Sequence, residues 1–61
     1  MKVRLLLRVE YYNDVDQFWS RDIDLTSLTL EEIQKTEDNL NQEKNNTSIY
    51  KIRIVAWSKF D

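Results

Sequence analysis

Residues 2–10 have the sequence KVRLLLRVE and alternate between apolar and mostly charged side chains. This alternation predicts a β-strand with one buried face. The buried face would carry Val3, Leu5, Leu7 and Val9. Because Leu5-Leu6-Leu7 is also the most apolar segment of the chain, we expect this strand to lie in the centre of a sheet. The other predicted elements are placed around it.

Residues 17–25 also alternate and predict an antiparallel partner strand. Asn13-Asp14 supplies the turn without glycine, because both residue types tolerate the left-handed conformation. A hairpin centred near Asp14 would place apolar residues opposite one another on one face and an ion pair on the other. The expected pairs are Val3 with Leu25, Leu5 with Ile23, Val9 with Trp19 and Arg4 with Asp24.

Thr29-Leu30-Glu31-Glu32 fits a capping box, in which Thr29 is the N-cap and Glu32 is the third helical residue. A helix is therefore predicted to begin here and to run to about Lys44, before Asn45-Asn46. Its apolar stripe is thin, because Glu37 interrupts it at the same spacing. The stripe consists of Leu30, Ile33 and Leu40.

Residues 48–57 predict a third strand. Its helix-facing side would carry Tyr50, Ile52, Ile54 and Ala56, and its other side Lys51, Arg53, Val55 and Trp57. Residues 1–61 are thus expected to form one α+β domain with a two-layer ββαβ fold. The antiparallel sheet would have the strand order 2-1-3, with a right-handed crossover through the helix, which covers one face.

One helix leaves apolar side chains on the other sheet face uncovered. These are Leu6, Phe18, Val55 and Trp57. We therefore expect a homodimer, which would cover them and enlarge a core that is small in a chain of 61 residues. The alternative is that the stems of Arg and Lys side chains cover them.

Acidic residues are segregated along the chain. Of the eleven carboxylates, all except Asp61 lie between Glu10 and Glu43, where the only bases are Arg21 and Lys35. That stretch carries a net charge of −8, whereas residues 1–8 and 44–61 carry +3 each, giving the overall −2. Such a surface is either ordinary solvated surface or a competitor of nucleic acid for basic proteins. The acids expected to remain outside cross-strand pairs are Asp14, Asp16, Glu31, Glu32, Glu37, Asp38 and Glu43.

Composition argues against several function classes. The chain has no cysteine and no histidine, which removes thiolate metal sites, disulfides and the commonest general base. Carboxylate pairs such as Glu31-Glu32 would need a deep pocket to shift their pKa values, so we expect no enzyme, cofactor or metal. No apolar run, Leu5-Leu6-Leu7 included, is long enough for a membrane span, so a cytosolic protein is expected.

Several segments occur in a recognisable order. They are the leucine-rich Val3-Arg4-Leu5-Leu6-Leu7, an acidic turn, Phe18-Trp19 at the start of the second strand, Leu25-Thr26-Ser27-Leu28 before an acidic and aliphatic helix, and the closing strand Ile49 to Trp57 with its Lys-Ile-Arg-Ile alternation. This order resembles the uracil-DNA glycosylase inhibitors made early in infection by small Bacillus podophages. The resemblance covers nearly the whole chain and consists of apolar and acidic patterns.

The resemblance implies a homodimer that mimics DNA, occupies the DNA-binding cleft of the glycosylase in the host cytoplasm and encloses a leucine of the enzyme between its two helices. Where the family has an aromatic residue followed by glutamate, this sequence has Leu30-Glu31, so the enclosing pocket would use Leu30, Ile33 and Leu40. The expected partner-binding residues are Asp14, Asp16, Leu30, Glu31, Glu32, Ile33, Glu37, Asp38 and Leu40. No contact with nucleic acid or membrane is expected.

A different class of function remains open at this point. A small dimeric nucleic-acid-binding module could use a basic outer sheet face, with Phe18 and Trp57 stacking on bases. That face would consist of Lys2, Arg4, Arg8, Lys51 and Arg53. A third possibility is a plain structural or assembly protein. Competition separates the first two hypotheses, because a mimic blocks the glycosylase and does not itself retain DNA.

Overall fold

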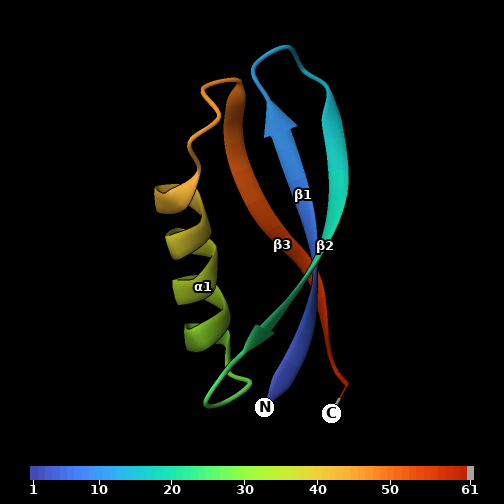
Figure 1. Ribbon diagram of the computed structural model, residues 1–61, viewed down its shortest axis with the longest axis vertical. Coiled ribbons are helices and arrows are strands. Elements are labelled where there is room, and N and C mark those ends of the chain that lie inside the picture. Colours follow the sequence, from blue (N-terminus) through green and yellow to red (C-terminus); the bar gives the residue numbers. More distant parts are fainter. Residues whose placement is uncertain (61) are drawn as a thin grey trace.

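The computed structural model describes residues 1–60. Its elements are β1 (Lys2–Tyr11), β2 (Asp16–Asp24), α1 (Leu30–Glu43) and β3 (Ile49–Lys59). The strands form one antiparallel sheet in the order β2-β1-β3, and α1 lies beside β3 along the long axis of the molecule (Figure 1). The predicted ββαβ fold and strand order are confirmed.

The core lies on one face of β1. Along this strand buried side chains alternate with exposed ones, because successive residues of a strand point to opposite faces. Every buried side chain in residues 1–60 is apolar. The buried residues are Val3, Leu5, Leu7, Val9, Leu25, Ile33, Leu40, Ile49 and Ile52. The most buried positions are those in β1, which confirms that this strand organises the fold.

The turn between β1 and β2 is closed around Asn13. Tyr11 N–H donates to the Val15 carbonyl and Asp14 N–H to the Tyr11 carbonyl, both at 3.1 Å. The Asn13 side-chain oxygen accepts from Val15 N–H at 3.2 Å. Asp14 has a φ of 66°, the left-handed conformation that Asn and Asp tolerate best among residues other than glycine. The predicted turn chemistry is therefore confirmed, but the turn is centred one residue earlier.

This earlier centre shifts the β1–β2 register by two residues, so the predicted pairs are wrong. The observed pairs are Val3 with Ile23, Leu5 with Arg21, Leu7 with Trp19, Val9 with Gln17 and Arg4 with Asp22. Because side-chain direction has a period of two, this shift leaves every residue on its predicted face. Hydrophobic alternation cannot distinguish two registers that differ by two residues.

α1 begins at the predicted cap. Thr29 has extended backbone angles, and its side-chain oxygen accepts a hydrogen bond from Glu32 N–H at 3.2 Å. At the other end, Lys44 N–H donates to the Leu40 carbonyl at 3.1 Å, and the chain leaves the helix there. The cap satisfies one of the helix N–H groups that have no partner within the helix.

Thr29→Ala is expected to lower the free energy of unfolding by about 1 kcal/mol, because the capping bond is lost while the packed side of the helix is unchanged. Urea unfolding followed by circular dichroism measures this. Thr26→Ala, at an exposed position just before the helix, is the control and should leave stability nearly unchanged. Equal effects of the two substitutions would contradict a capping role for Thr29.

β3 contains a bulge that the sequence pattern conceals. Leu7 lies opposite Ile54 and Leu6 opposite Ala56, so Val55 is the extra residue. A bulge reverses the alternation of the strand beyond it. Three consecutive apolar residues, Ile54-Val55-Ala56, give no signal of where this reversal occurs.

The bulge corrects two predicted orientations. Trp57 lies opposite Leu5 and so shares the core side of the sheet, although it was predicted to face away. Ala56 lies opposite Leu6 on the outer side, although it was predicted to face the helix. Directly opposed residues of an antiparallel pair point to the same face, which fixes both assignments.

A second register shift near the start of β3 corrects the prediction for Tyr50. Tyr11 lies opposite Ile49 whereas Glu10 lies opposite Lys51, so Tyr50 falls between the two pairs. Ile49 is buried, and Tyr50 is exposed beside Tyr12 instead of packing under the helix.

Side chains of α1 occupy the outer backbone edge of β3. Three polar residues at positions i, i+4 and i+7 lie on one side of the helix. Glu37 Oε2 accepts a hydrogen bond from Ile54 N–H at 2.8 Å. The Asn41 amide makes two bonds to Ile52, accepting from its N–H at 2.8 Å and donating to its carbonyl at 2.9 Å. Lys44 Nζ donates to the Tyr50 carbonyl at 2.6 Å. The helix thereby closes this edge over Tyr50–Ile54, where an edge strand would otherwise leave unpaired main-chain groups.

Candidate functional site

The free side of α1 carries two of the predicted partner-binding residues, Glu31 and Asp38, and a third, Leu30, is the first residue of the helix, on the same side as Glu37. Leu30 is 73% exposed, and Glu31 and Asp38 are exposed as well. Glu31 and Asp38 are seven residues apart, which places them on the same side of the helix about two turns apart. Neither carboxylate forms an ion pair or hydrogen bond with another residue in the described range 1–60. These acids are therefore available to a partner.

Glu32 and Leu40 lie at a different place, along a groove between α1 and β2. One part of this groove has a volume of about 290 Å³. Its lining includes Arg21 and Ile23 from β2, and Lys35 and Glu43 from α1. Its charged lining residues are two bases, Arg21 and Lys35, and three acids, Asp24, Glu32 and Glu43, so its net charge is −1. It does not continue the acidic surface of Glu31 and Asp38.

Two predicted contact residues belong to the core instead of a partner pocket. Ile33 and Leu40 are each only 6% exposed and pack in the core cluster of the sheet. The helix has few apolar residues, and the protein's own sheet buries these two. The predicted pocket of Leu30, Ile33 and Leu40 is therefore corrected, because Leu30 alone faces solvent in the single chain.

Two predicted free acids are engaged within the fold. The Glu37 carboxylate accepts from the Ile54 main chain, as described above, and is half-buried. Asp16 accepts from Arg8 Nη2 at 2.6 Å. Asp14 belongs to the turn between β1 and β2, and this turn lies at the opposite end of the molecule from the start of α1 (Figure 1). The nine predicted residues therefore do not form one continuous site.

The outer face of the sheet carries three ion pairs. They are Arg4 with Asp22 at 2.8 Å, Arg8 with Asp16 at 2.6 Å, and Arg53 with Glu10. Hydrogen bonding from the Arg4 guanidinium, more than its charge, lowers the pKa of Asp22, and partial desolvation opposes this shift. Arg4 replaces its predicted partner Asp24 with Asp22, as the register requires.

These pairs reduce the positive potential on which the nucleic-acid-binding alternative depends. The proposed basic residues, Lys2, Arg4, Arg8, Lys51 and Arg53, share this face with four acids by the register of the sheet. The acids are Glu10, Asp16, Asp22 and Asp24. Each of the three arginines is held by a carboxylate, so little unpaired positive charge is left for phosphates.

Large apolar side chains remain uncovered in the single chain. On the outer face Leu6 and Phe18 are 41% and 63% exposed, Val55 at the bulge is 46% exposed, and on the core side of the sheet Trp19 and Trp57 are 42% and 40% exposed. In the half of the molecule toward the hairpin end, α1 lies beside β3 and β2 lies on the far side of the sheet from the helix (Figure 1). Part of both faces of the sheet is therefore open to a second molecule.

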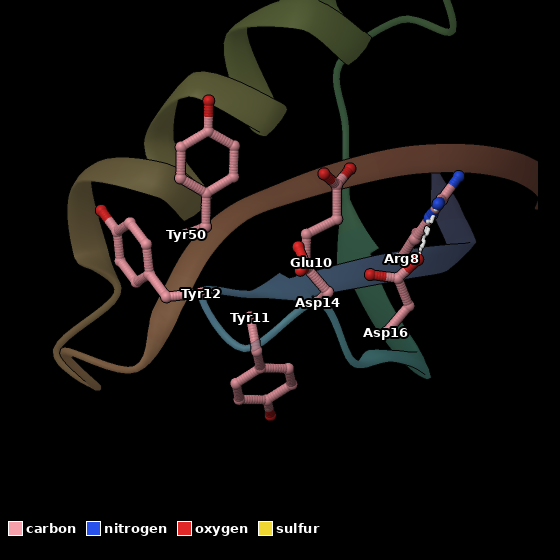
Figure 2. Close-up of a pocket in the computed structure, with 7 residues that line it drawn as sticks. All are labelled: Arg8, Glu10, Tyr11, Tyr12, Asp14, Asp16 and Tyr50. Carbon is pink, nitrogen blue, oxygen red and sulfur yellow. Dashed lines mark hydrogen bonds and ion pairs between the residues drawn. The ribbon is translucent and has the colours of Figure 1, made fainter.

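Sequence reasoning missed a hollow at the hairpin end of the sheet. Its volume is about 430 Å³. Its lining consists of Arg8, Glu10, Tyr11, Tyr12, Asp14, Asp16 and Tyr50, shown in Figure 2. The sequence feature that could have indicated this hollow is Tyr11-Tyr12 directly before the turn, together with Tyr50 at the start of an antiparallel strand. The register shift that turns Tyr50 outward is what brings these tyrosines together.

No family model, curated protein or solved structure matches this chain. Within residues 1–60, the structure has no helix long and apolar enough to cross a membrane.

Proposed function

We propose that the protein is a DNA-mimic inhibitor of a uracil-DNA glycosylase, acting in the cytoplasm of a bacterial host to protect phage DNA from base excision. The observation that carries the proposal is the free side of α1, where Glu31 and Asp38 have no internal partner beside the exposed Leu30. The resemblance to the podophage inhibitors adds the identity of the target class.

The charge of the helix supports this proposal. α1 holds five carboxylates and one lysine, a net charge of −4. A DNA-binding cleft attracts negative charge, and complementary potentials accelerate encounter and favour the correct partner. The acids of the sheet contribute less, because several are paired with arginine. The helix is therefore the part of the surface best able to replace DNA phosphates.

Leu30 supplies the apolar part of the proposed interface. An exposed leucine flanked by Glu31 can enter an apolar recess of the enzyme while the carboxylate contacts a basic rim. This arrangement replaces the enclosing pocket expected from the resemblance, because Ile33 and Leu40 lie in the core. The interface would consequently depend more on charge than an interface built around a fully enclosed leucine.

The protein is expected to be a homodimer at micromolar concentration, because its exposed apolar side chains leave a single chain with open surface on both faces of the sheet. Sedimentation equilibrium should return twice the chain mass of 7.4 kDa. A mass of one chain across the micromolar range, together with a cooperative thermal melt, would show that the monomer is stable alone.

A uracil-excision assay tests the proposal directly. A purified bacterial uracil-DNA glycosylase is titrated with the protein, and the mixture is also run in gel filtration. We expect inhibition that rises with inhibitor concentration, co-elution with the enzyme and no retention of DNA by the protein alone. Retention of DNA without inhibition would instead support the nucleic-acid-binding alternative. Neither inhibition nor co-elution at micromolar concentration would reject the glycosylase as the target.

A further inference from the structure

The hollow at the hairpin end combines aromatic walls with negative charge. Three of its seven lining residues are tyrosines, three are carboxylates and one is Arg8, so its net charge is −2. Tyr12 and Tyr50 point to the same side as Glu10 and Asp14, whereas Tyr11 points away (Figure 2). Aromatic faces next to carboxylates are the surroundings that an organic cation prefers.

Tyr12 and Tyr50 form an ordered wall of this hollow. Their ring centroids are 5.3 Å apart at an interplanar angle of 72°, an edge-to-face pair. Main-chain bonds hold both residues, from Tyr12 N–H to the Ser48 carbonyl at 3.0 Å and from Lys44 Nζ to the Tyr50 carbonyl at 2.6 Å. The rings are nevertheless 68% and 52% exposed. They are positioned by the fold but not covered by it.

The carboxylates of the hollow differ in their partners. Glu10 is paired with Arg53 and Asp16 with Arg8. The side chain of Asp14, in contrast, has no hydrogen bond or ion pair with any other residue among 1–60. The hollow thus contains one carboxylate and a pair of aromatic rings that the fold places together but does not use.

On another surface of the same chain, a guanidinium contacts both a carboxylate and an aromatic ring. On the outer sheet face, the Arg4 guanidinium binds both oxygens of Asp22, at 2.8 and 3.1 Å. The same guanidinium lies 4.7 Å from the centre of the Phe60 ring. Arginine, carboxylate and aromatic ring together form one unit there. At the hairpin end, Arg8 is already paired with Asp16, and no guanidinium within residues 1–60 contacts the Asp14 carboxylate or the rings of Tyr12 and Tyr50 in this way.

We infer that this hollow binds an arginine side chain of a partner protein. A guanidinium is planar, so it can stack on Tyr12 or Tyr50 and at the same time donate hydrogen bonds to Asp14. A lysine ammonium is a compact, strongly hydrated charge and cannot make both contacts with the same geometry. The inference goes beyond the proposed function, because it concerns a different surface from the free side of α1 and does not depend on which protein supplies the arginine.

The test uses N-acetyl-arginine amide as the probe and nuclear magnetic resonance of the full chain as the measurement. We expect saturable shifts of the Tyr12, Tyr50 and Asp14 signals, with a dissociation constant on the order of 1–10 mM for a single residue. N-acetyl-lysine amide should bind at least about threefold more weakly.

Variants separate the site from general attraction to an acidic protein. Tyr12→Leu and Asp14→Asn should each weaken binding about threefold, and asparagine retains the tolerance for the left-handed backbone at position 14. Phe18→Leu and Asp38→Asn are the matched controls, an exposed aromatic residue and an exposed acid that do not line the hollow, and should leave binding unchanged. Thermal melts establish that each variant is folded.

Three results would overturn the inference: shifts that grow linearly and spread over the acids of α1, equal binding of the arginine and lysine probes, or equal effects of the site and control variants. The inhibition assay is independent of this test. Arginine binding without glycosylase inhibition would retain the hollow and reject the proposed function. Inhibition without arginine binding would support the proposed function and reject the hollow as an arginine site.

Discussion

Asn41→Ala is expected to lower the free energy of unfolding by about 2 kcal/mol, a large share of the stability of so small a domain. The Asn41 amide exchanges two hydrogen bonds with the main chain of Ile52, at 2.8 and 2.9 Å, and donates a third to the Glu37 carbonyl. Without it, a partly buried N–H and C=O of β3 lose their partners. Removing one member of such a pair costs more than the net value of the bond.

Asn39→Ala is the matched control for this change. It is the same substitution in the same helix, at an exposed position. Alanine favours the helix over asparagine at both sites, so the difference between the two variants isolates the contacts with β3. Urea unfolding of both measures it. If the two variants are equally stable, water replaces Asn41 on the strand and the helix does not depend on this contact.

Glu31→Lys is expected to weaken inhibition of the glycosylase at least about tenfold, because it places a positive charge against a cleft that binds phosphates. The fold should lose little, since Glu31 is exposed and has no partner in residues 1–60. Ser20→Lys, an added positive charge on the outer face of β2, is the control and should inhibit like the parent. Inhibition curves and thermal melts are measured for each.

Leu30→Asp tests the apolar contact at the same end of the helix. The leucine is 73% exposed, so the substitution should leave stability almost unchanged. In the complex, however, a carboxylate in an apolar recess would have to lose its water without gaining a partner, and inhibition should fall strongly. If Glu31→Lys and Leu30→Asp both stay folded and inhibit like the parent, α1 is not the recognition element.

The elements of the fold could be predicted because their signals are local. The alternation of residues 2–10 and the cap at Thr29 each depend on a few neighbouring residues, and the structure confirms both. The register of β1 with β2 depends on where the turn closes, and alternation alone allows shifts of two. The bulge at Val55 lies inside an apolar run and has no composition signal. These two features required the three-dimensional pairing.

The candidate site was harder to predict because a carboxylate looks the same in sequence whether it is free or engaged. Glu37 and Glu31 both lie on the helix, but Glu37 bonds to the Ile54 main chain and Glu31 faces solvent. The tyrosine hollow depended on the outward turn of Tyr50, which follows from a register shift. Tertiary contacts therefore decide which polar residues remain available for function.

The closed edge of β3 also limits how copies of this protein can assemble. Since α1 occupies the main chain of β3 over Tyr50–Ile54, a strand of full length can be added only beside β2. Head-to-tail growth into a fibre requires two different open edges on each chain, whereas a single open edge can join one other copy around a two-fold axis and no more. The helix thus prevents another full-length strand from pairing with β3, and edge-to-edge assembly through full-length strands is limited to a closed pair.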